Sequence, residues 1–328
     1  MIWRHVGAIT LFLFFALSLA ASRATAADKP AFDVWLGELQ REAAEKGIGK
    51  ATIDSALVGL KPIPRVIELD RRQPEFTLTF QQYMDRVVPQ SRVEKGKQRL
   101  NENRAMLERV SKKYGVQARF IVAFWGIETD FGRVTGGFPV IAALATLAYD
   151  GRRSSYFRKE LMYALEIVDR GHIGAKEMMG SWAGAMGQAQ FMPSSFKSFA
   201  VDGDGDGRID LWTNKADVFA SAANYLARSG WKGDETWGRP VKLPEGFDTS
   251  AVGAKVRKPI TAWQAMGIRR LDGGDLPKRD LKAAIVLGDG KTGPAFLVYD
   301  NYHTILKWNR SVFFAVAVGS LADRIGGG

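Results

Sequence analysis

The sequence predicts a mainly α-helical protein that carries a small β-containing insert. Apolar residues recur at helical spacing over most of residues 32–228, as is typical of helices that bury one face. From about Gly238 the chain instead contains prolines, glycines and short alternating runs, and an apolar helix returns at Val312–Ile325. The 328 residues, 46% of them hydrophobic, are enough for one large domain or two to three smaller ones.

Residues 1–27 have the composition of a secretory signal peptide. A charged start precedes the apolar segment Val6–Ala21, and Ala24-Thr25-Ala26 follows as an A-x-A cleavage pattern. The apolar segment is short for a membrane-spanning helix, and the chain has no cysteine to carry a lipid anchor. We therefore expect export to the periplasm by a cleaved signal peptide, without a membrane anchor.

The residue counts argue against several kinds of site and partner. Without cysteine there is no thiolate nucleophile or cysteine-ligated zinc, and two isolated histidines, His172 and His303, disfavour a histidine metal site or a Ser-His-Asp triad. Loss of Arg4 and Arg23 with the leader lowers the net charge from +11 to +9, which still favours an anionic partner such as a cell-wall polymer. Export and the lack of a basic stripe interleaved with aromatic residues argue against nucleic acid.

Residues 28–115 are predicted to form an N-terminal helical part. Apolar residues at helical spacing mark three helices, at Phe32–Lys46, Lys50–Leu60 and Ser91–Tyr114. Between the last two lies Phe76–Arg86, which contains Tyr83; taken alone, this tyrosine is a residue at the edge of the core.

The following part, residues 116–237, contains the segment that points most directly to chemistry. Phe120–Gly132 is an almost wholly apolar run with one glutamate, Glu128, close to its end. Such a run predicts a buried helix, so that Glu128 should lie at the edge of the core. Loss of water raises the pKa of a carboxyl group, as a general acid near neutral pH requires. The alternative is a structural glutamate held by a nearby arginine.

Two unusual arginines follow. A helix of small residues is predicted at Val140–Tyr149, and Arg152, Arg153 and Tyr156 begin the next helix, which runs to about Arg170. Two cations at a helix start oppose the helix dipole, so they do not serve helix stability. They are predicted to hold a carboxylate or to line a groove, or they are plain solvated charge.

An uncharged segment rich in glycine and alanine spans residues 180–195 and carries Ser181, Gln188 and Gln190. Small residues allow the backbone to approach a ligand or another helix closely. A short helix is predicted to start at Pro193.

The next loop has the spacing of a calcium site. Asp202, Asp204 and Asp206 alternate with glycines, and a further glycine at the sixth position permits the sharp turn of an EF-hand loop. The backbone carbonyl of Arg208 would be a further ligand. Position twelve is a threonine instead of the usual glutamate, so the closing ligand of this EF-hand-like loop (residues 202–217) is predicted to be Asp217, with Asp210 as the competitor. Without a cation the three carboxylates would repel one another.

The remaining elements complete the predicted organisation. Lys215–Arg228 has the pattern of a helix, and residues 238–306 form a small β-containing module with one short helix after Thr261. Its predicted strands are Arg239–Leu243, Ala283–Leu287 and Ala295–Tyr299, with a turn at Asp289-Gly290. Residues 307–328 return as a C-terminal helix to the helical part.

Taken together, these segments resemble the lytic murein transglycosylase B family, glycoside hydrolase family 103. The matching motifs are Trp-Gly-Ile-Glu-Thr-Asp-Phe-Gly at 125–132, Ser-Trp-Ala-Gly-Ala-Met-Gly-Gln-Ala-Gln-Phe-Met-Pro-Ser-Ser at 181–195, Asp-Gly-Asp-Gly-Asp-Gly at 202–207, Ala-Asn-Tyr-Leu at 223–226 and Trp-Asn-Arg-Ser at 308–311. They occur in the family's order over nearly the whole chain after the leader. One departure is Phe314, where some members have tyrosine, which removes one hydrogen bond from the groove.

The resemblance implies a lysozyme-like helical catalytic core at 116–237 and cleavage of the β-1,4 bond between N-acetylmuramic acid and N-acetylglucosamine in peptidoglycan, without water, to leave 1,6-anhydromuramic acid ends. It implies that Glu128 is the catalytic acid and base, with no catalytic cofactor and one structural calcium or similar cation. The implied partners are glycan strands, with room for other wall-synthesis or remodelling proteins. The implied groove residues are Tyr83, Arg152, Arg153, Tyr156, Ser181, Gln190, Phe191, Tyr225 and Asn309.

The residues themselves are compatible with this chemistry. Ordinary glycosidases need two carboxylates, but only Glu128 has a suitable apolar setting. Asp130, two residues on, should point to a different face and is predicted to be structural. A single acid suffices if the 2-acetamido group stabilises the reaction centre and the muramoyl C6 hydroxyl attacks. The alternatives are a hydrolytic muramidase and a non-catalytic wall-binding scaffold.

Overall fold

The computed structural model describes residues 29–72, 78–290 and 292–327, so the predicted signal peptide lies outside the described residues. The helices are α1 (Phe32–Glu45), α2 (Lys50–Leu57), α3 (Pro64–Arg72), α4 (Phe80–Val87), α5 (Gln90–Glu102), α6 (Arg104–Tyr114), α7 (Ala118–Thr129), α8 (Val140–Asp150), α9 (Ser154–Asp169), α10 (Pro193–Phe199), α11 (Lys215–Arg228), α12 (Ile260–Ala265), α13 (Asp300–Trp308) and α14 (Val312–Gly326). The strands are β1 (Phe138–Pro139), β2 (Met179–Gly180), β3 (Gly238–Lys242), β4 (Lys258–Pro259), β5 (Arg269–Arg270), β6 (Lys282–Asp289) and β7 (Thr292–Val298). Within these ranges, no helix combines the length and apolar character needed to cross a membrane.

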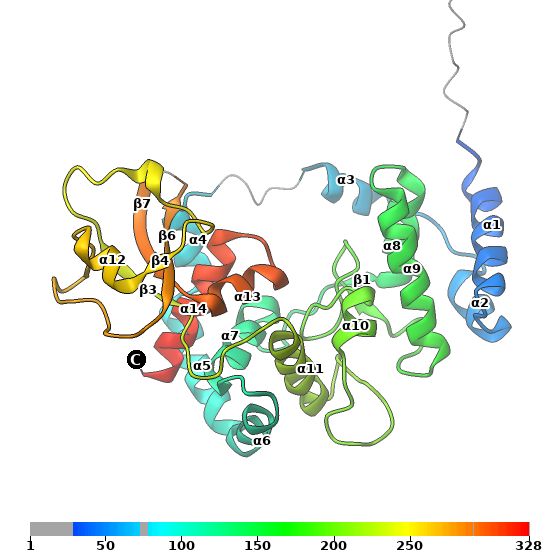
Figure 1. Cartoon of the computed structure of the whole chain (residues 1–328). Helices are drawn as coiled ribbons and strands as arrows, with labels where there is room; N and C mark the ends of the chain where they lie inside the picture. The colour runs from blue at the N-terminus through cyan, green and yellow to red at the C-terminus, as the bar shows by residue number, and fades with distance from the viewer. Residues whose placement is uncertain (1–28, 73–77, 291, 328) are drawn as a thin grey trace, which may run out of the picture.

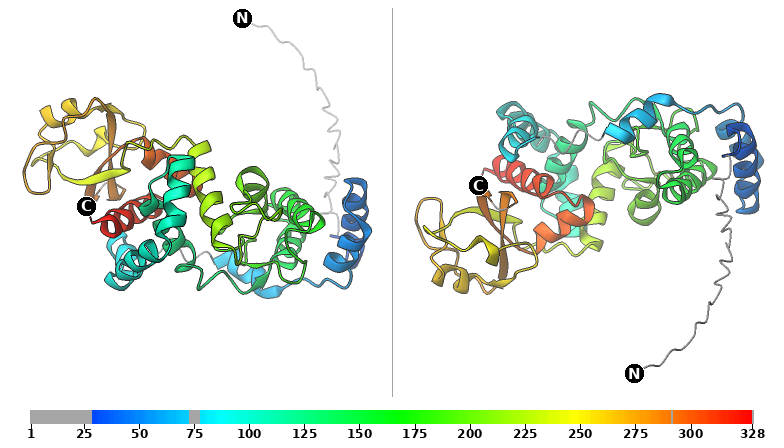
Figure 2. Two further views of the ribbon diagram at one scale, coloured as in Figure 1. Left: turned by 90° about the horizontal axis from the view of Figure 1, so that it is seen from below. Right: turned by 90° about the horizontal axis from the view of Figure 1, so that it is seen from above.

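The molecule is elongated, with α1 and α2 at one end and the β-containing module at the other (Figures 1 and 2). Between them, α7 lies in the middle and contacts α5, α6, α11 and α14. The last helix, α14, also packs against α4 and α5, so this helix lies beside helices from the N-terminal part of the chain.

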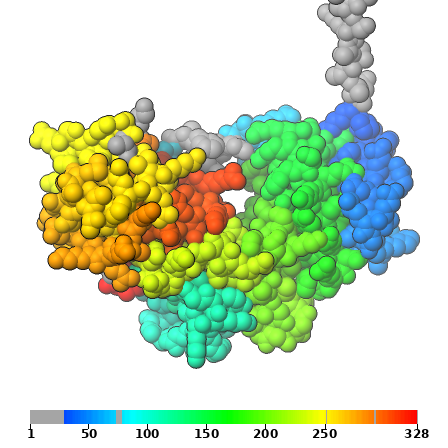
Figure 3. Space-filling view, viewed as in Figure 1, coloured from blue at the N-terminus to red at the C-terminus, as the bar shows by residue number. Residues whose placement is uncertain are grey.

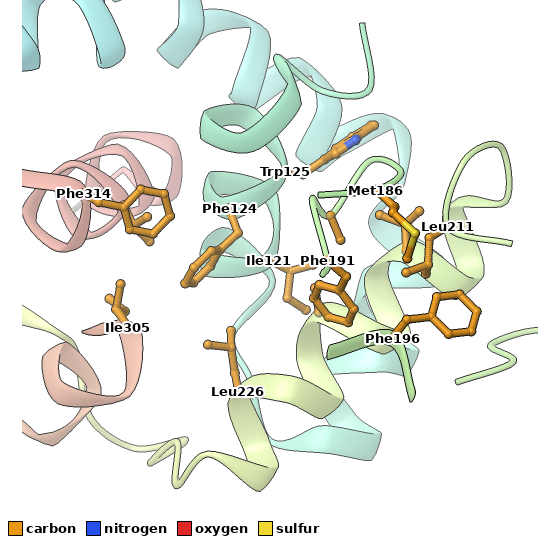
Figure 4. Close-up of a cluster of buried hydrophobic side chains, with 14 of the residues drawn as sticks. Ile121, Phe124, Trp125, Met186, Phe191, Phe196, Leu211, Leu226, Ile305 and Phe314 are labelled. Carbon is orange, nitrogen blue, oxygen red and sulfur yellow. The ribbon is translucent and has the colours of Figure 1, made fainter. Parts of the chain in front are cut away.

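The buried core explains why α7 shows no amphipathic pattern. Its residues 120–126 are all buried, and their side chains point to opposite sides of the helix. Figure 4 shows Phe124 directed toward Phe314 of α14 and Ile305 of α13, while Trp125 points to the other side, toward the segment of Met186. Because neighbours surround the middle of α7, every face there must be apolar, and only the two ends of the helix are partly exposed.

The β-containing module is built on one antiparallel sheet with the order β4-β6-β7-β3-β5. In the central pair, Ala284 lies opposite Val298 and Val286 opposite Phe296, and these four side chains join the main helical core. The alternate residues, such as Ile285 and Leu297, face a second core around Trp263 of α12. Strand β6 is therefore buried on both faces and anchors the module to the helices.

Most predicted helices and strands are confirmed, but three predictions need correction. The helix predicted at Ser91–Tyr114 is two helices, because Asn103 ends α5 with its side-chain amide on the carbonyl of Arg99 at 2.8 Å. Helix α3 begins at Pro64, in the stretch between the predicted helices Lys50–Leu60 and Ser91–Tyr114 where no helix was predicted. The end of the predicted β-containing range 238–306 holds α13, since the sheet itself ends at Val298.

Candidate active site

Glu128 lies in the last turn of α7, where the helix ends in an unusual backbone. Asp130 and Phe131 both adopt left-handed conformations, with φ of 49° and 61°, followed by Gly132 at 82°. Left-handed backbone in two successive non-glycine residues is costly and persists only where the surroundings impose it. Here Thr129 imposes it, because its hydroxyl accepts the N–H of Gly132 at 3.0 Å and donates to the carbonyl of Gln188 at 2.9 Å.

The carboxyl group of Glu128 has one hydrogen-bond donor among the described residues. The indole N–H of Trp308, at the end of α13, donates to Glu128 Oε1 at 2.7 Å. Burial raises the pKa of Glu128 to about 7, although the hydrogen bond from Trp308 acts in the opposite direction. This is the direction of shift that the sequence predicts, and no arginine pairs with Glu128 in the part of the chain that the structure describes. At pH values below 7 the group is mostly a carboxylic acid that can donate a proton.

A groove of about 850 Å³ opens beside Glu128. One wall comes from α4, a second from the β6–β7 hairpin, and the third from the link between α13 and α14. In Figure 3 the surface is hollowed between the β-containing module and the lobe of α8 and α9, with orange-red surface from the α13 region exposed in the hollow. The described lining residues are Leu78, Tyr83, Val87, Ile127, Glu128, Leu287, Gly288, Gly290, Asn309, Arg310, Ser311, Val312, Phe313 and Phe314.

The groove is held in shape by contacts between distant segments. Asp289 of the β6–β7 hairpin accepts the backbone N–H of Phe80 in α4 at 2.8 Å. A Cβ at Gly288 would lie 2.8 Å from the ring of Phe80, so only glycine lets the hairpin approach α4 this closely. The rings of Tyr83 in α4 and Phe313 in α14 contact each other in a tilted arrangement, with centroids 5.5 Å apart, and so join two walls of the groove. Tyr83 and Asn309 are therefore placed in the groove with Glu128, as the sequence predicts.

An aromatic cluster surrounds the indole that contacts Glu128. The ring of Trp308 lies 4.5 Å from Phe124, 4.7 Å from Tyr225 and 5.2 Å from Phe191. Phe191 is buried, and the hydroxyl of Tyr225 donates to the carbonyl of Lys307 at 2.7 Å. These two predicted groove residues thus contact Glu128 through Trp308. Phe314, which lines the groove, also contacts Phe124, with ring centroids 5.9 Å apart.

The glycine-rich segment braces the floor of the site. Gln190, at a φ of 48°, donates its amide to the carbonyls of Thr135 and Gly187 at 3.0 and 2.9 Å, and Ser181 accepts the N–H of Ala185 at 3.0 Å. The structure therefore gives both predicted groove side chains local partners that fix the loops after α7 and β2.

Asp130 has surroundings opposite to those of Glu128. Its carboxylate accepts from Arg133 at 2.6 Å and Lys95 at 3.1 Å, and Arg92 lies 3.8 Å away. Although partial burial acts in the opposite direction, the hydrogen bonds from Arg133 and Lys95 lower the pKa of Asp130. A carboxylate held by cations is a poor proton donor, which agrees with the structural role predicted for it.

Arg152 and Arg153 contact a carboxylate, one of the alternatives that the sequence left open. Both contact Asp70 of α3, which is 1% exposed, with Arg152 at 3.6 Å. Arg153 has a left-handed φ of 61° at the N-terminus of α9. Tyr156 is 45% exposed on the same helix. None of the three is among the described residues that line the groove beside Glu128.

The aspartate loop brings three carboxylates together. Asp202, Asp204 and Asp217 have oxygen atoms that all lie within 4.8 Å of one another. The backbone N–H groups of Gly207 and Gly205 lower the pKa of Asp202, whereas burial, with the neighbouring aspartates, raises the pKa of Asp217. A set of converging carboxylate oxygens is the donor set that hard cations such as calcium prefer.

The other predicted ligands are arranged differently. Asp206 accepts the N–H of Arg208 at 2.8 Å and is not part of the three-carboxylate group. Asp210 accepts from Thr213 Oγ1 at 2.5 Å, from Arg208 at 3.1 Å and from two backbone N–H groups. Asp217 belongs to the three-carboxylate group and Asp210 does not, so the geometry favours Asp217 over Asp210 as the closing residue.

Two residues that the sequence reasoning missed are central to the site. Trp308 lies within a quoted motif but 180 positions from Glu128, and nothing local indicates that they touch. Gln188 was noted only as part of the glycine-rich segment. Its amide accepts from Trp125 Nε1 and donates to the carbonyl of Trp212, both at 2.8 Å, and so links α7 to the end of the aspartate loop. The sequence did contain a signal for Gln188, because a polar side chain within a segment of small, uncharged residues indicates a specific hydrogen-bonding role.

Comparison with known proteins gives consistent results. The family model of the transglycosylase SLT domain matches residues 31–323. The chain is 34% identical over 257 residues to membrane-bound lytic murein transglycosylase B of Escherichia coli, a match that covers 74% of this chain and 66% of that relative, just under two thirds of its length.

Two solved structures are similar over most of the chain. SltB3 from Pseudomonas aeruginosa, in complex with NAG-anhNAM-pentapeptide, has a TM-score of 0.88 and 44% identity, covering 91% of this chain and 80% of that one. Slt35 from Escherichia coli, in complex with calcium, has a TM-score of 0.76 and 28% identity, covering 89% and 92%.

Proposed function

Because the chain belongs to the transglycosylase SLT domain family, we propose that it is a lytic transglycosylase that cleaves the β-1,4 bond between N-acetylmuramic acid and N-acetylglucosamine in peptidoglycan. The observation that carries the proposal is the single carboxyl group in the groove lining, Glu128, with its pKa raised to about 7. Relatives of this fold act on the same polymer by name, and SltB3 binds a product-like fragment with an anhydromuramoyl end.

Glu128 acts first as the acid. Its proton passes to the glycosidic oxygen, the bond from that oxygen to the muramoyl C1 breaks, and the N-acetylglucosamine part leaves as an alcohol. Positive charge develops at C1, where the 2-acetamido group of the substrate stabilises it. No second carboxylate lines the described groove, which disfavours the two-carboxylate mechanisms of other glycosidases.

Glu128 then acts as the base. As a carboxylate it accepts the proton of the muramoyl C6 hydroxyl, whose oxygen forms a bond to C1 and closes the 1,6-anhydro ring. The hydroxyl belongs to the same sugar and is already in position, so it competes with water at a high effective concentration. The apolar walls of the groove favour the same outcome by restricting water.

The remaining site residues bind the glycan in this proposal. Tyr83 and Asn309 contact sugars directly in the groove, and Phe191 and Tyr225 hold Trp308 against Glu128. Ser181 and Gln190 shape the floor beyond Glu128. The remaining predicted residues, Arg152, Arg153 and Tyr156, lie at the start of α9 and would contact the glycan farther from Glu128, on the lobe of α8 and α9.

Two properties extend the proposal. The group of Asp202, Asp204 and Asp217 would hold one structural calcium ion, with Asp206 and the carbonyl of Arg208 completing its shell on small movements of the loop. After removal of residues 1–27 the protein would act in the periplasm, where its glycan substrate and any wall-remodelling partners occur.

Identification of the cleaved ends tests the reaction directly. Purified peptidoglycan is digested with the protein, and the soluble fragments are separated and weighed by mass spectrometry. We expect 1,6-anhydromuramoyl ends, 18 mass units lighter than reducing ends because no water is added. Reducing muramoyl ends would instead identify a hydrolytic muramidase, and no fragments at all would identify a wall-binding scaffold.

The role of Glu128 is tested by Glu128→Gln. This change keeps the shape and an acceptor for Trp308 but removes the proton, so we expect turnover to fall by about three orders of magnitude while glycan binding is kept. Glu108→Gln, at an exposed glutamate on α6, is the matched control and should behave as wild type. Unchanged turnover in Glu128→Gln would rule out the assigned role.

A further inference from the structure

The groove beside Glu128 has a cation whose role the reaction leaves open. Among the described lining residues, Arg310 is the only one with a cationic side chain. Building on the proposed function, we propose that Arg310 binds a carboxylate on the muramoyl side chain of the glycan and thereby selects the strand that the enzyme cuts.

The backbone around Arg310 is fixed while its side chain is left free. It lies in the short link between α13 and α14, where Asn309 Oδ1 accepts the N–H of Ser311 at 3.0 Å. Ser311 in turn caps α14 by accepting the N–H of Phe314 at 3.3 Å. Both neighbours therefore use their side chains to hold the link, and Arg310 is presented from a rigid position.

Arg310 has no partner within the described parts of the chain. It is exposed and forms no hydrogen bond, ion pair or aromatic contact there, unlike Arg257 and Arg270 in the β-containing module, which pair with Asp300 and Asp272. Asp289 is not among the described lining residues, and its carboxylate accepts the N–H of Phe80 at 2.8 Å. A ligand carboxylate therefore meets no competing acid on this arginine.

The walls of the groove strengthen such a contact. Leu287, Val312 and Phe313 line it together with Arg310. Apolar walls lower the effective dielectric constant, so a guanidinium–carboxylate pair is stronger here than on an open surface. Glu128, with its raised pKa, is mostly uncharged below pH 7 and does not repel an incoming carboxylate. The planar guanidinium can bind both oxygens of a carboxylate at once.

The chemistry of the substrate limits the source of the carboxylate. The two sugars of the glycan are neutral, and acid groups occur only on the lactyl side chain of muramic acid. On a strand with stem peptides the carboxylates belong to the peptide, whereas on a strand stripped of peptides the lactyl group itself ends in a free carboxylate. Both sources offer the same group to Arg310, and different substrates separate them.

The test compares three substrates with matched variants. The substrates are peptide-bearing glycan, glycan stripped of its peptides by an amidase, and stripped glycan whose lactyl carboxylates have been converted to neutral methylamides. For each we measure kcat/KM from the release of anhydromuramoyl ends, and Kd with the Glu128→Gln background. The variants are Arg310→Gln, Arg310→Lys and, as the control at an exposed arginine of α6 that has no ion pair among the described residues, Arg109→Gln.

We expect Arg310→Gln to lose about tenfold in kcat/KM and in affinity on at least one carboxylate-bearing substrate and to match wild type on the methylamide. Arg310→Lys should fall between them, since a lysine keeps the charge but not the paired hydrogen bonds. A loss confined to peptide-bearing glycan assigns the stem peptide, and a loss confined to stripped glycan assigns the lactyl carboxylate.

Equal losses on all three substrates, or no loss on any, would overturn the proposal. The Arg109→Gln control separates a specific effect from a general change in net charge. The outcome is also separable from the reaction itself, because anhydromuramoyl ends from the wild type with no effect at Arg310 refute only the role of this arginine.

Discussion

Glu128 and the aspartate loop use the same functional group under opposite conditions. Among the described residues, Trp308 alone donates a hydrogen bond to Glu128, and burial raises the pKa of Glu128 to about 7. Asp202 is approached by the backbone N–H groups of Gly205 and Gly207 at 2.6 and 2.8 Å, which lower its pKa. One carboxyl group thus keeps its proton near neutral pH and the other loses it readily.

The comparison shows that donors and burial, not residue type, decide which chemistry a carboxyl group performs. An apolar helix end with a single donor produces an acid, while a glycine-rich loop that turns its N–H groups inward produces an anion suited to a cation. Each region would fail in the other's role. Asp130, at the end of the same helix, supports this view. The cations Lys95 and Arg133 contact its carboxylate and stabilise the charged form, whereas no cation does so at Glu128 among the described residues.

The largest expected effect comes from breaking the link between the two regions. Gln188→Leu keeps the volume but leaves the buried indole N–H of Trp125 and the partly buried carbonyl of Trp212 without these partners. We expect a loss of about 3 kcal/mol in the free energy of unfolding, measured by urea denaturation, because each buried unsatisfied group costs about 1–3 kcal/mol. Gln98→Leu, at an exposed glutamine on α5, should change stability by less than about 0.5 kcal/mol.

If Gln188 couples the regions, its loss should also reduce turnover at Glu128. A loss of stability without any change in turnover would mean that Gln188 does not couple the aspartate loop to Glu128.

The local features of both regions were predictable from the sequence. The apolar run before Glu128 and the alternating aspartates each lie within about a dozen residues, and helical or loop geometry converts such spacing directly into proximity. For the same reason the β6–β7 hairpin and the helix at Lys215–Arg228 were predicted closely.

The contacts between distant segments were not predictable. Trp308 reaches Glu128 across 180 positions, and Asp70 meets Arg153 across 83. No periodicity encodes such pairings, because they depend on how α3 and α13 pack, and neither helix was predicted. Sequence reasoning therefore singled out Glu128 as the candidate acid but not Trp308, the residue that donates a hydrogen bond to it.

The second largest expected effect is the stabilisation of the aspartate loop by calcium. With calcium well above its Kd we expect the melting temperature to rise by about 5 °C, and a chelator should reverse the rise. Asp204→Asn should abolish it, since Asp204 lies in the group with Asp202 and Asp217. Without calcium the same variant should be at least as stable as wild type, because one of three mutually repelling charges is gone.

Asp280→Asn, an exposed aspartate of the β-containing module, is the control and should keep the full response to calcium. A melting temperature of the wild type that does not respond to calcium would contradict the proposed site.

The smallest expected effect is a change in the pKa of Glu128 in the variant Trp308→Phe. Phenylalanine keeps an aromatic ring against Phe124 and Tyr225 but cannot donate to Glu128 Oε1. That hydrogen bond lowers the pKa of Glu128 against the larger effect of burial, so its loss should raise the pKa above about 7.

In the proposed mechanism the acid form of Glu128 starts the reaction, so kcat/KM should fall as pH rises through its pKa, tenfold for each pH unit. In Trp308→Phe this falling limb should move to higher pH by about half a pH unit, which corresponds to less than 1 kcal/mol, and the absolute rate should drop because the carboxyl group is less well oriented. Trp35→Phe, at a tryptophan of α1 whose ring packs on Phe32 and Tyr149, should leave the profile unchanged. A limb that stays in place in Trp308→Phe would show that burial alone sets the pKa of Glu128, and the indole would then be a packing residue.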